Sequence, residues 1–423
     1  MKRKFAILLS AMLLMQAVCG CGGAASSGTS SASASTDSTA SKSSEKAVIV
    51  TDEQDFTHEN GITRLAKEIY GDLNVEFFVL SEDAQERETQ ISSLRVEIMA
   101  GGGPDGYLLS SPTSNMTFNG EGHPAALFPD VQRTMQSGAF LPLDDYIKES
   151  EYLRSEDHFA PVFDTGKTDE GQVVLPITYY ASVFLLDKAQ LADPDFTPKT
   201  WDELVNCEDT AVLKVVRNNL YTWCGAGIPR IADYATEKTI LTEENLTAQF
   251  ENLLAMPASE SFDEETALIQ SGSYAQTDEG MAYYAQNKDT VNALAIPNTE
   301  GGVTAFITSY AAINRNSPKA DEVFRFFELL FSDEAQIDTE TVNDARGTLL
   351  MLGNQNSFLT HKNAYLQPEL LESVQSRVNA VRFYSVMDYT IYDTATTLTW
   401  EENPDCAAAA HSVMEALQTR LSE

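Results

Sequence analysis

The chain has 423 residues, of which 28 are Lys or Arg and 63 are Asp or Glu, so its formal net charge at pH 7 is −35. A protein this acidic repels nucleic acid and anionic membrane surfaces, which excludes functions that depend on a basic binding face. The same acidity disfavours a phosphate-like ligand, although a few well-placed arginines would still hold one. The five cysteines contain no C-x-x-C pair and the five histidines are scattered, so no metal site or cofactor is predicted.

The N-terminal segment is typical of an export signal. Residues 2–4 are basic and residues 5–18 are almost entirely apolar, a run shorter than the roughly 20 residues that span a bilayer. The string Val18-Cys-Gly-Cys21 resembles a bacterial lipobox. We expect residues 1–20 to be removed as a signal peptide and Cys21 to carry the lipid, including palmitate. The protein would then lie on the extracellular face of the cell membrane, in a Gram-positive bacterium.

A serine-rich segment follows the lipidated cysteine. Residues 24–46 contain ten serines and almost no large apolar side chains. Such a segment cannot bury enough surface to offset the entropy of ordering it, so residues 21–46 are predicted to be a flexible linker. The remaining chain, from Ala47 onward, is long enough for two domains.

Strands and helices alternate in the first part of this body. Residues 47–50, 75–80 and 107–109 are predicted strands, and residues 61–70 and 87–99 are predicted amphipathic helices. This alternation predicts a parallel sheet covered by helices. Because ligands bind at the carboxyl ends of such strands, the loops after Val50 and Leu109 are the first candidate binding positions.

The glycine-rich segment 101–106 is not typical of a phosphate-binding loop. It follows a helix and precedes a strand, whereas a nucleotide-binding loop follows a strand and precedes a helix. We predict a helix C-cap and turn, in which glycine adopts positive φ. Further along, Thr200 is predicted to cap the helix that starts at Trp201, and Trp201 is predicted to be a core residue.

Five motifs in one order carry a family resemblance. They are Met99-Ala-Gly-Gly-Gly-Pro-Asp105; Gly138-Ala-Phe-Leu-Pro-Leu-Asp-Asp145; Leu175-Pro176 with Leu186-Asp187-Lys188; Pro198-Lys-Thr-Trp-Asp-Glu-Leu204; and Ala295-Ile-Pro297 with residues 309–313 and the helix 320–331. Together they resemble the extracellular solute-binding proteins of ABC importers, in the maltose-binding-protein-like group. One departure is Leu186, where that family often has Tyr.

The resemblance implies an α/β, two-lobed fold of the type II periplasmic-binding-protein kind. Each lobe would hold a mixed, mainly parallel sheet flanked by helices, with lobe 1 formed by residues 47–172 plus 297–346 and lobe 2 by residues 173–296 plus 347–423. Chain crossings are expected near residues 171–175, Ile296 and residues 346–350. The implied function is capture of a small solute, a sugar or oligosaccharide, by hinge closure and delivery to membrane permease subunits. Such a protein acts as a monomer and is not an enzyme.

The predicted ligand-binding residues combine aromatic rings with hydroxyl and carboxylate groups, because ring faces suit sugar rings and polar groups bind their hydroxyls. Tyr180 is preferred over Tyr179, since neighbouring strand residues face opposite sides. The other candidates are Tyr221, Trp223, Tyr283, Tyr284 and Trp400, with Asp55, Ser110, Ser111 and Ser114 on the first lobe.

Three alternatives stay open. Glu53 and Asp55, with the overall acidity, favour a receptor for a polyamine or another cationic solute. A surface glycan-sensing lipoprotein without a permease would share the same fold. A glycosidase that uses two carboxylates is the enzymatic alternative. The sequence does not decide whether Cys207 and Cys224 form a disulfide or which sugar binds.

Overall fold

The computed structural model describes residues 46–112, 126–219, 225–257, 278–337, 344–352, 357–365 and 369–422. The chain consists of two units, residues 1–44 and residues 45–423. The predicted signal peptide, Cys21 and most of the linker lie outside the described residues. No helix in the described ranges is both long enough and apolar enough to cross a membrane.

A seven-stranded mixed sheet forms the centre of the fold. Its strands are β1 (Ala47–Thr51), β2 (Val75–Val79), β3 (Gly106–Ser110), β6 (Leu175–Ala181), β11 (Val303–Ile313), β12 (Phe358–Leu359) and β13 (Val378–Phe383). Their order is β12-β6-β11-β3-β1-β2, and β13 also pairs with β11. The predicted parallel strands at the start of the body are confirmed, because β1 pairs in parallel with both β2 and β3.

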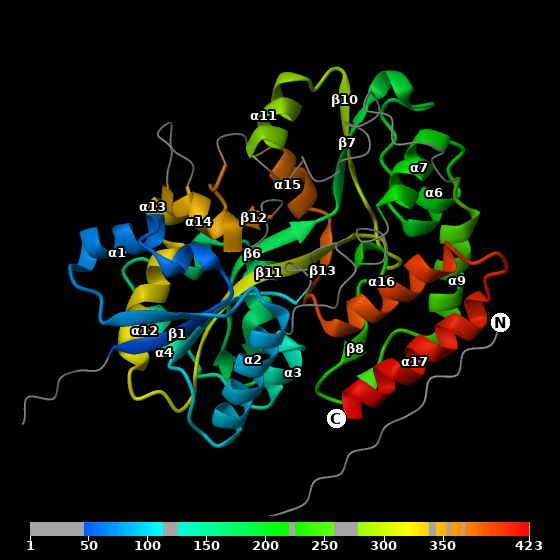
Figure 1. Cartoon of the computed structure of the whole chain (residues 1–423). Helices are drawn as coiled ribbons and strands as arrows, with labels where there is room; N and C mark the ends of the chain where they lie inside the picture. Colours follow the sequence, from blue (N-terminus) through cyan, green and yellow to red (C-terminus); the bar gives the residue numbers. More distant parts are fainter. Residues whose placement is uncertain are drawn as a thin grey trace, which may run out of the picture. The chain divides into compact units, whose positions relative to one another are not determined.

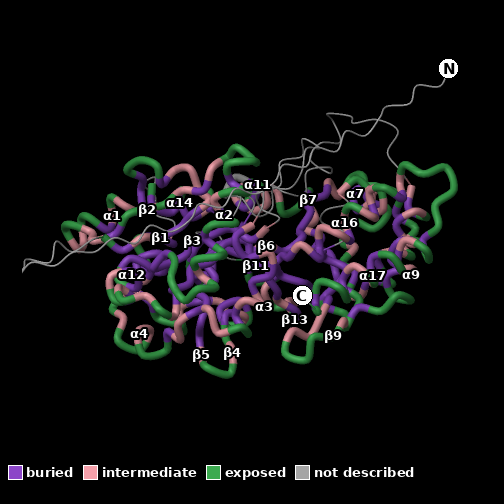
Figure 2. The backbone as a smooth tube through the Cα atoms, turned by 60° about the horizontal axis from the view of Figure 1, so that its bottom comes forward, coloured by how far each residue is buried: buried purple, intermediate pink, exposed green. Residues whose placement is uncertain are grey.

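Helices surround this sheet and form most of the rest of the molecule. Their bounds are α1 (Gly61–Tyr70), α2 (Ala84–Met99), α3 (Val131–Gln136), α4 (Asp144–Glu149), α5 (Ala160–Phe163), α6 (Trp201–Val205), α7 (Thr210–Asn218), α9 (Glu243–Ala255), α11 (Asp278–Gln286), α12 (Ala320–Phe327), α13 (Asp333–Gln336), α14 (Asp344–Leu352), α15 (Glu369–Gln375), α16 (Val386–Leu398) and α17 (Cys406–Ser422). Figure 1 shows α12 beside β1, and α9, α16 and α17 together. Figure 2 shows the inner strands β1, β3, β6 and β11 as largely buried, whereas the outer helices carry many half-buried and exposed residues.

The buried side chains form two separate hydrophobic cores, which define the two lobes. The first core surrounds the seven-stranded sheet. The second core is built from apolar side chains of α6, α7, α9, α16 and α17. Because each core is covered by its own helices, the chain forms two lobes rather than one.

A two-stranded antiparallel ribbon lies between the cores. It pairs β7 (Val183–Asp187) with β10 (Val291–Ala295). Along β7, Val183 and Leu185 belong to the first core, whereas Phe184 and Leu186 belong to the second. This is the alternation that an extended strand produces, so each face of the ribbon packs on a different core.

The second lobe differs from the expectation of a mainly parallel sheet. The described strands there pair antiparallel: β7 with β10, and the short β8 (Ala232–Asp233) with β9 (Lys238–Thr239). The chain segments also divide differently between the cores. Leu349, Phe358 and Phe383, placed by the prediction in lobe 2, lie in the first core because β12 and β13 pair with β6 and β11. Buried side chains join the second core again from Met387 onward.

Local predictions about helix ends are confirmed. Thr200 accepts a hydrogen bond from the Glu203 N–H at 3.2 Å and so caps α6, and Trp201 is buried in the second core. Gly101 and Gly103 have φ values of 80° and 90°, a conformation that glycine adopts without strain, so the chain turns sharply between α2 and β3.

Candidate functional site

The carboxyl ends of several strands meet near the middle of β11. β3 runs antiparallel to β11 and ends with Ser110 opposite Ser309. β13 lies parallel to the other half of β11 and ends with Phe383 opposite Ile307. These two strands therefore run toward each other and leave Thr308 between their ends. Since ligands bind at the carboxyl ends of strands, this meeting point is the candidate site.

A β-bulge lies at this meeting point. The register of β11 against β6 shifts between Ile307 and Ser309, which leaves Thr308 as the extra residue. The hydroxyls of Thr308 and Ser309 lie 2.8 and 2.5 Å from the hydroxyl of Thr178, and Ser357 lies 2.8 Å from Thr308. All four side chains are buried. A bulge bends its strand and redirects side chains, so β11 changes direction where its partner changes from β13 to β3.

A buried ion pair lies at the end of β1 and β3. The Asp52 carboxylate accepts hydrogen bonds from the N–H and the hydroxyl of Ser110, at 3.1 and 2.9 Å, and lies 3.6 Å from the Arg87 guanidinium. Burial raises the pKa of the Asp52 carboxyl, and Arg87 and Ser110 partly oppose that rise. A cavity of about 10 Å³ borders the pair, between Pro112, Phe128 and Tyr310, and has room for one water.

A second buried ion pair lies at the end of β13. The Arg382 guanidinium lies 4.6 Å over the Phe306 ring and pairs with Asp388 at 2.5 Å. Phe306 in turn stacks on Tyr384, with ring centroids 4.3 Å apart and planes 12° apart. A side chain at Gly225 would bring its Cβ to 3.0 Å from Phe306, so glycine lets this segment approach the stack. The stack joins β11 and β13 of the sheet to the start of α16.

Tyr179 and Tyr180 differ as strand alternation predicts. Tyr179 is fully buried, and its hydroxyl accepts a hydrogen bond from the Gln375 amide at 2.8 Å. Tyr180 is half-buried and lies opposite Phe306 in the sheet. The two rings therefore point to opposite faces of β6, and Tyr180 is the less buried of the two.

The other predicted ligand residues are spread over several elements. Ser110 and Ser111 are buried, and Ser111 donates its hydroxyl to the Ile307 carbonyl at 2.6 Å. Tyr283 is exposed and Tyr284 is half-buried, both on α11. Trp400, between α16 and α17, is 84% exposed. The structure therefore brings the two serines to the strand ends beside Asp52. The remaining candidates Tyr221, Trp223 and Ser114 lie outside the described residues.

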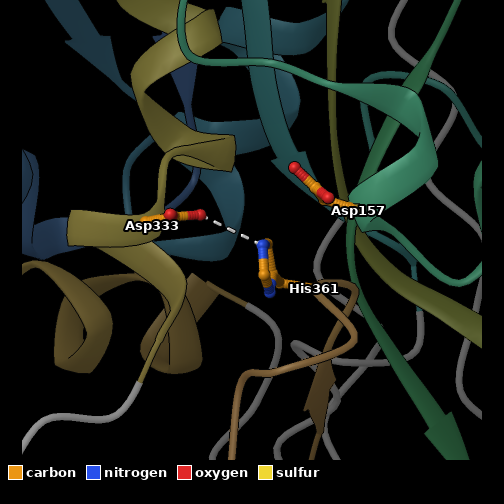
Figure 3. A group of neighbouring side chains, drawn as sticks. All are labelled: Asp157, Asp333 and His361. Atoms are coloured by element: carbon orange, nitrogen blue, oxygen red, sulfur yellow. Dashed lines mark ion pairs between the residues drawn. The ribbon is translucent and has the colours of Figure 1, made fainter.

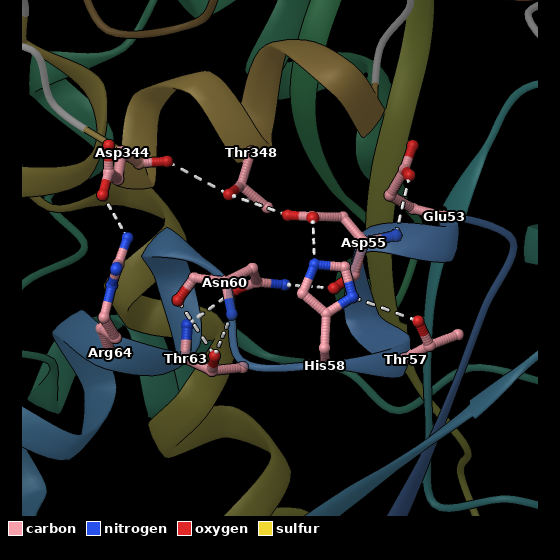
Figure 4. Close-up of polar contacts among 9 residues, drawn as sticks. All are labelled: Glu53, Asp55, Thr57, His58, Asn60, Thr63, Arg64, Asp344 and Thr348. Carbon is pink, nitrogen blue, oxygen red and sulfur yellow. Dashed lines mark hydrogen bonds and ion pairs between the residues drawn. The ribbon is translucent and has the colours of Figure 1, made fainter.

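Asp55 belongs to a separate polar network (Figure 4). Its carboxylate lies 3.1 Å from His58 and 3.4 Å from the Thr348 hydroxyl, and its N–H donates to Glu53 at 3.0 Å. These contacts fasten the 3-10 helix η1 (Gln54–Thr57) to α14. Burial raises the pKa of the neighbouring Glu53 carboxyl, and the charges of nearby carboxylates add to the rise.

The sequence-based candidates omitted Asp52, Arg87 and Arg382. Asp52 is the first residue after β1, so its position in the candidate loop would have identified it as a possible ligand residue. The arginines gave no comparable signal, since nothing in the spacing shows that α2 and β13 direct guanidinium groups toward these strand ends.

Asp157, Asp333 and His361 form a cluster outside this site (Figure 3). His361 Nε2 lies 3.2 Å from an Asp333 oxygen, while the Asn363 N–H donates to His361 Nδ1 at 3.1 Å. A neutral ring that accepts at Nδ1 carries its proton on Nε2, which leaves no lone pair there for a metal. Arg154 also pairs with both carboxylates, at 2.6 and 3.4 Å. The pattern fits an internal carboxylate–imidazole–guanidinium network.

Residues 57–337 match the model of the family of bacterial extracellular solute-binding proteins, and the chain therefore belongs to that family. The match covers well over half of the sequence and includes the end of β3 and the whole of β11, whereas Asp52 and the end of β13 lie outside the matched range. The family is a class of substrate-binding proteins. No curated protein sequence matches the chain.

Solved structures show the same fold. The sugar-binding protein MalE from Xanthomonas citri aligns with a TM-score of 0.57 at 11% identity, over 89% of this chain and 97% of that one. A chitin oligosaccharide binding protein gives 0.52 at 16% identity, over 90% and 100%. The substrate-binding protein Lmo0181 from Listeria monocytogenes, in complex with cycloalternan, gives 0.51 at 12% identity, over 89% and 99%. The chain therefore has the two-lobed α/β fold of type II solute-binding proteins.

Proposed function

We propose that this protein is the lipid-anchored, extracellular substrate-binding component of an ABC importer, which captures a sugar or oligosaccharide as a monomer and passes it unaltered to a membrane permease. The observation that carries this proposal is the pair of hydrophobic cores linked through a ribbon, with polar strand ends meeting on β11. That arrangement suits a protein whose two lobes close around a small ligand. The structural neighbours that bind sugars and oligosaccharides support the choice of solute.

Closure would act through the segments that link the cores. β6 gives way to β7 at Ser182, and the Ile296 N–H donates to the Ser182 carbonyl at 2.9 Å. A small backbone change at these two positions would rotate the second core relative to the first. The solute would then shift the population toward the closed state, because only that state lets both lobes contact it.

The ligand would lie against aromatic and polar groups from both lobes. Tyr180 supplies a ring near the strand ends, and Tyr221, Trp223, Tyr283 and Tyr284 are the proposed rings of the second lobe. Ser110 and Ser111 would lie close to the sugar at the strand ends, where the protein holds their hydroxyls through Asp52 and the Ile307 carbonyl. Trp400 and Asp55 remain candidates at the rim.

Calorimetry with the purified chain that begins after Cys21 tests the proposal. We expect one site per monomer for at least one member of a panel of neutral oligosaccharides, with a change in tryptophan fluorescence on closure. Hydrolysis of the bound saccharide, or two equal sites, would contradict it. Spermidine belongs in the same panel, because the half-buried Glu53 and Asp55 after β1 favour a cationic solute as the second candidate.

A further inference from the structure

We infer that the captured solute carries no anionic group: the site accepts neutral or amine-bearing saccharides and rejects uronates and sugar phosphates. The inference builds on the proposed function and adds the charge class of the ligand. It depends on where the cationic side chains are, and every one of them in the folded body can be placed.

The sequence contains 28 Lys and Arg residues, and four of them, Lys2, Arg3, Lys4 and Lys42, precede residue 46, which leaves 24. All 24 lie in the described ranges. The segments 113–125, 220–224, 258–277, 338–343, 353–356 and 366–368 contain no Lys or Arg and only one histidine, His123. A cation that could hold an anionic ligand must therefore come from the described residues.

The two guanidinium groups at the strand ends are already matched by carboxylates. Arg87 is 5% exposed and faces Asp52, and Arg382 is 6% exposed and pairs with Asp388. Arg382 also donates to the Ile228 carbonyl at 3.2 Å. An anionic ligand that approached either arginine would lie beside a buried carboxylate, in a region of low dielectric constant where like charges repel strongly.

Several other cations among the described residues are also engaged by the protein. Arg346 is buried, lies 4.9 Å over the Tyr365 ring and donates to the Ala364 carbonyl at 3.3 Å. Arg95 donates to the carbonyls of residues 126 and 127. Lys188 and Lys288, which flank the ribbon strands β7 and β10, pair with Asp195 and Glu369.

Carboxylates are the charged groups that remain partly open at the end of β1. Glu53 and Asp55 are both half-buried there. With a net charge of −35 on the whole chain, the field at this end of the sheet attracts an amine and repels a carboxylate or phosphate. The charge class of the ligand therefore follows from the pairing of both strand-end arginines with carboxylates and from this field, rather than from a specific contact with the ligand.

The test uses three oligosaccharides of one length and linkage: a neutral one that binds, its amine-bearing analogue and its uronate analogue. Calorimetry at pH 7.5 should give at least tenfold weaker binding of the uronate, and binding of the amine equal to or tighter than that of the neutral sugar. The differences should shrink in 0.5 M salt, which screens charge. Uronate affinity within threefold of the neutral sugar would overturn the inference and leave the proposed function intact. Failure of every saccharide would instead overturn the function.

Two variants sharpen the result. Asp52→Asn keeps an oxygen for Ser110 but leaves Arg87 without its carboxylate, so uronate binding should improve relative to the neutral sugar. Glu53→Gln keeps an acceptor for the Asp55 N–H and should weaken only the amine analogue, by about threefold. Asp344→Asn, which alters an exposed ion pair with Arg64, is the matched control. If Asp52→Asn does not fold, Glu53→Gln still decides, because unchanged amine selectivity in that variant would contradict the inference.

Discussion

The two buried ion pairs beside β11 have the same composition and different construction. In the pair at the end of β3, the carboxylate makes most of the contacts: Asp52 accepts hydrogen bonds from the N–H and the hydroxyl of Ser110, and Arg87 lies 3.6 Å away. In the pair at the end of β13, the guanidinium is the centre: Arg382 contacts a carboxylate, an aromatic face and a carbonyl. A buried charge depends on all its partners, so the two pairs should respond differently to removal of one member.

The largest effect is expected from Arg382→Met. The change leaves Asp388 buried without its cation and removes the contact over Phe306, so unfolding free energy should fall by about 3–5 kcal/mol. Urea denaturation followed by circular dichroism measures this. Arg64→Met is the matched control, because the Arg64–Asp344 pair is exposed and should contribute at most about 1 kcal/mol. Equal losses in the two variants would show that Arg382 has no special role.

The second prediction concerns the carboxylate next to that pair, Asp130. It caps α3 by accepting the Arg133 N–H, and burial, with the charge of Asp388, raises its pKa to about 6. A carboxyl with a raised pKa binds more protons folded than unfolded between pH 4 and pH 6. The folded state therefore loses stability as pH rises through that window, and the loss is complete above it.

Asp130→Asn should remove this pH-dependent loss. Asparagine caps helices as well as aspartate, so the variant should match the wild type near pH 4 and exceed its stability by about 2 kcal/mol at pH 8. Thermal denaturation at both pH values tests this. A variant that is less stable than the wild type at pH 8 would show that the charge of Asp130 stabilises the folded state.

The third prediction addresses the bulge between the two pairs. Thr308→Val keeps the shape of the side chain but leaves the hydroxyls of Thr178 and Ser357 with one partner fewer, at a cost of about 1–2 kcal/mol. Ser93→Ala, which removes an exposed hydroxyl of α2 that lies 3.5 Å from Glu97, is the comparison. A loss at Thr308 no larger than at Ser93 would indicate that the hydroxyl chain adds nothing to the bend in β11.

The parts of the molecule that the sequence predicted are those with local causes. The alternation of residues 47–109 predicted β1, α1, β2, α2 and β3 because periodicity and turns are properties of neighbouring residues. The helix cap at Thr200 has the same local origin. The division of the chain between the cores was less predictable, because β12 and β13 join the first sheet by pairing with strands far away in the sequence.

The candidate site shows the same limit. The loop after β1 was predicted to hold a polar ligand group, and Asp52 lies there, but its partner Arg87 is 35 positions later in the chain (87 − 52). The loop sequence alone does not distinguish Asp52 from Asp55. The structure gives Asp55 its own partners, His58 and Thr348, and the second of these comes from α14.

The last comparison concerns ligand binding at Tyr180, where the expected loss of affinity is the smallest of these effects. Tyr180 pairs with Phe306, the residue under Arg382, whereas its neighbour Tyr179 holds Gln375 inside the first core. Tyr180→Ala should weaken binding of a neutral oligosaccharide about tenfold, since a stacked ring contributes on the order of 1–2 kcal/mol. Its unfolding free energy should change less than that of Tyr179→Ala, which removes a fully buried ring at a cost of about 3–5 kcal/mol. Calorimetry and urea denaturation on both variants separate the two roles. Unchanged affinity in Tyr180→Ala would move the sugar-binding ring to another position, because the half-buried face of β6 would then serve only to pack the sheet.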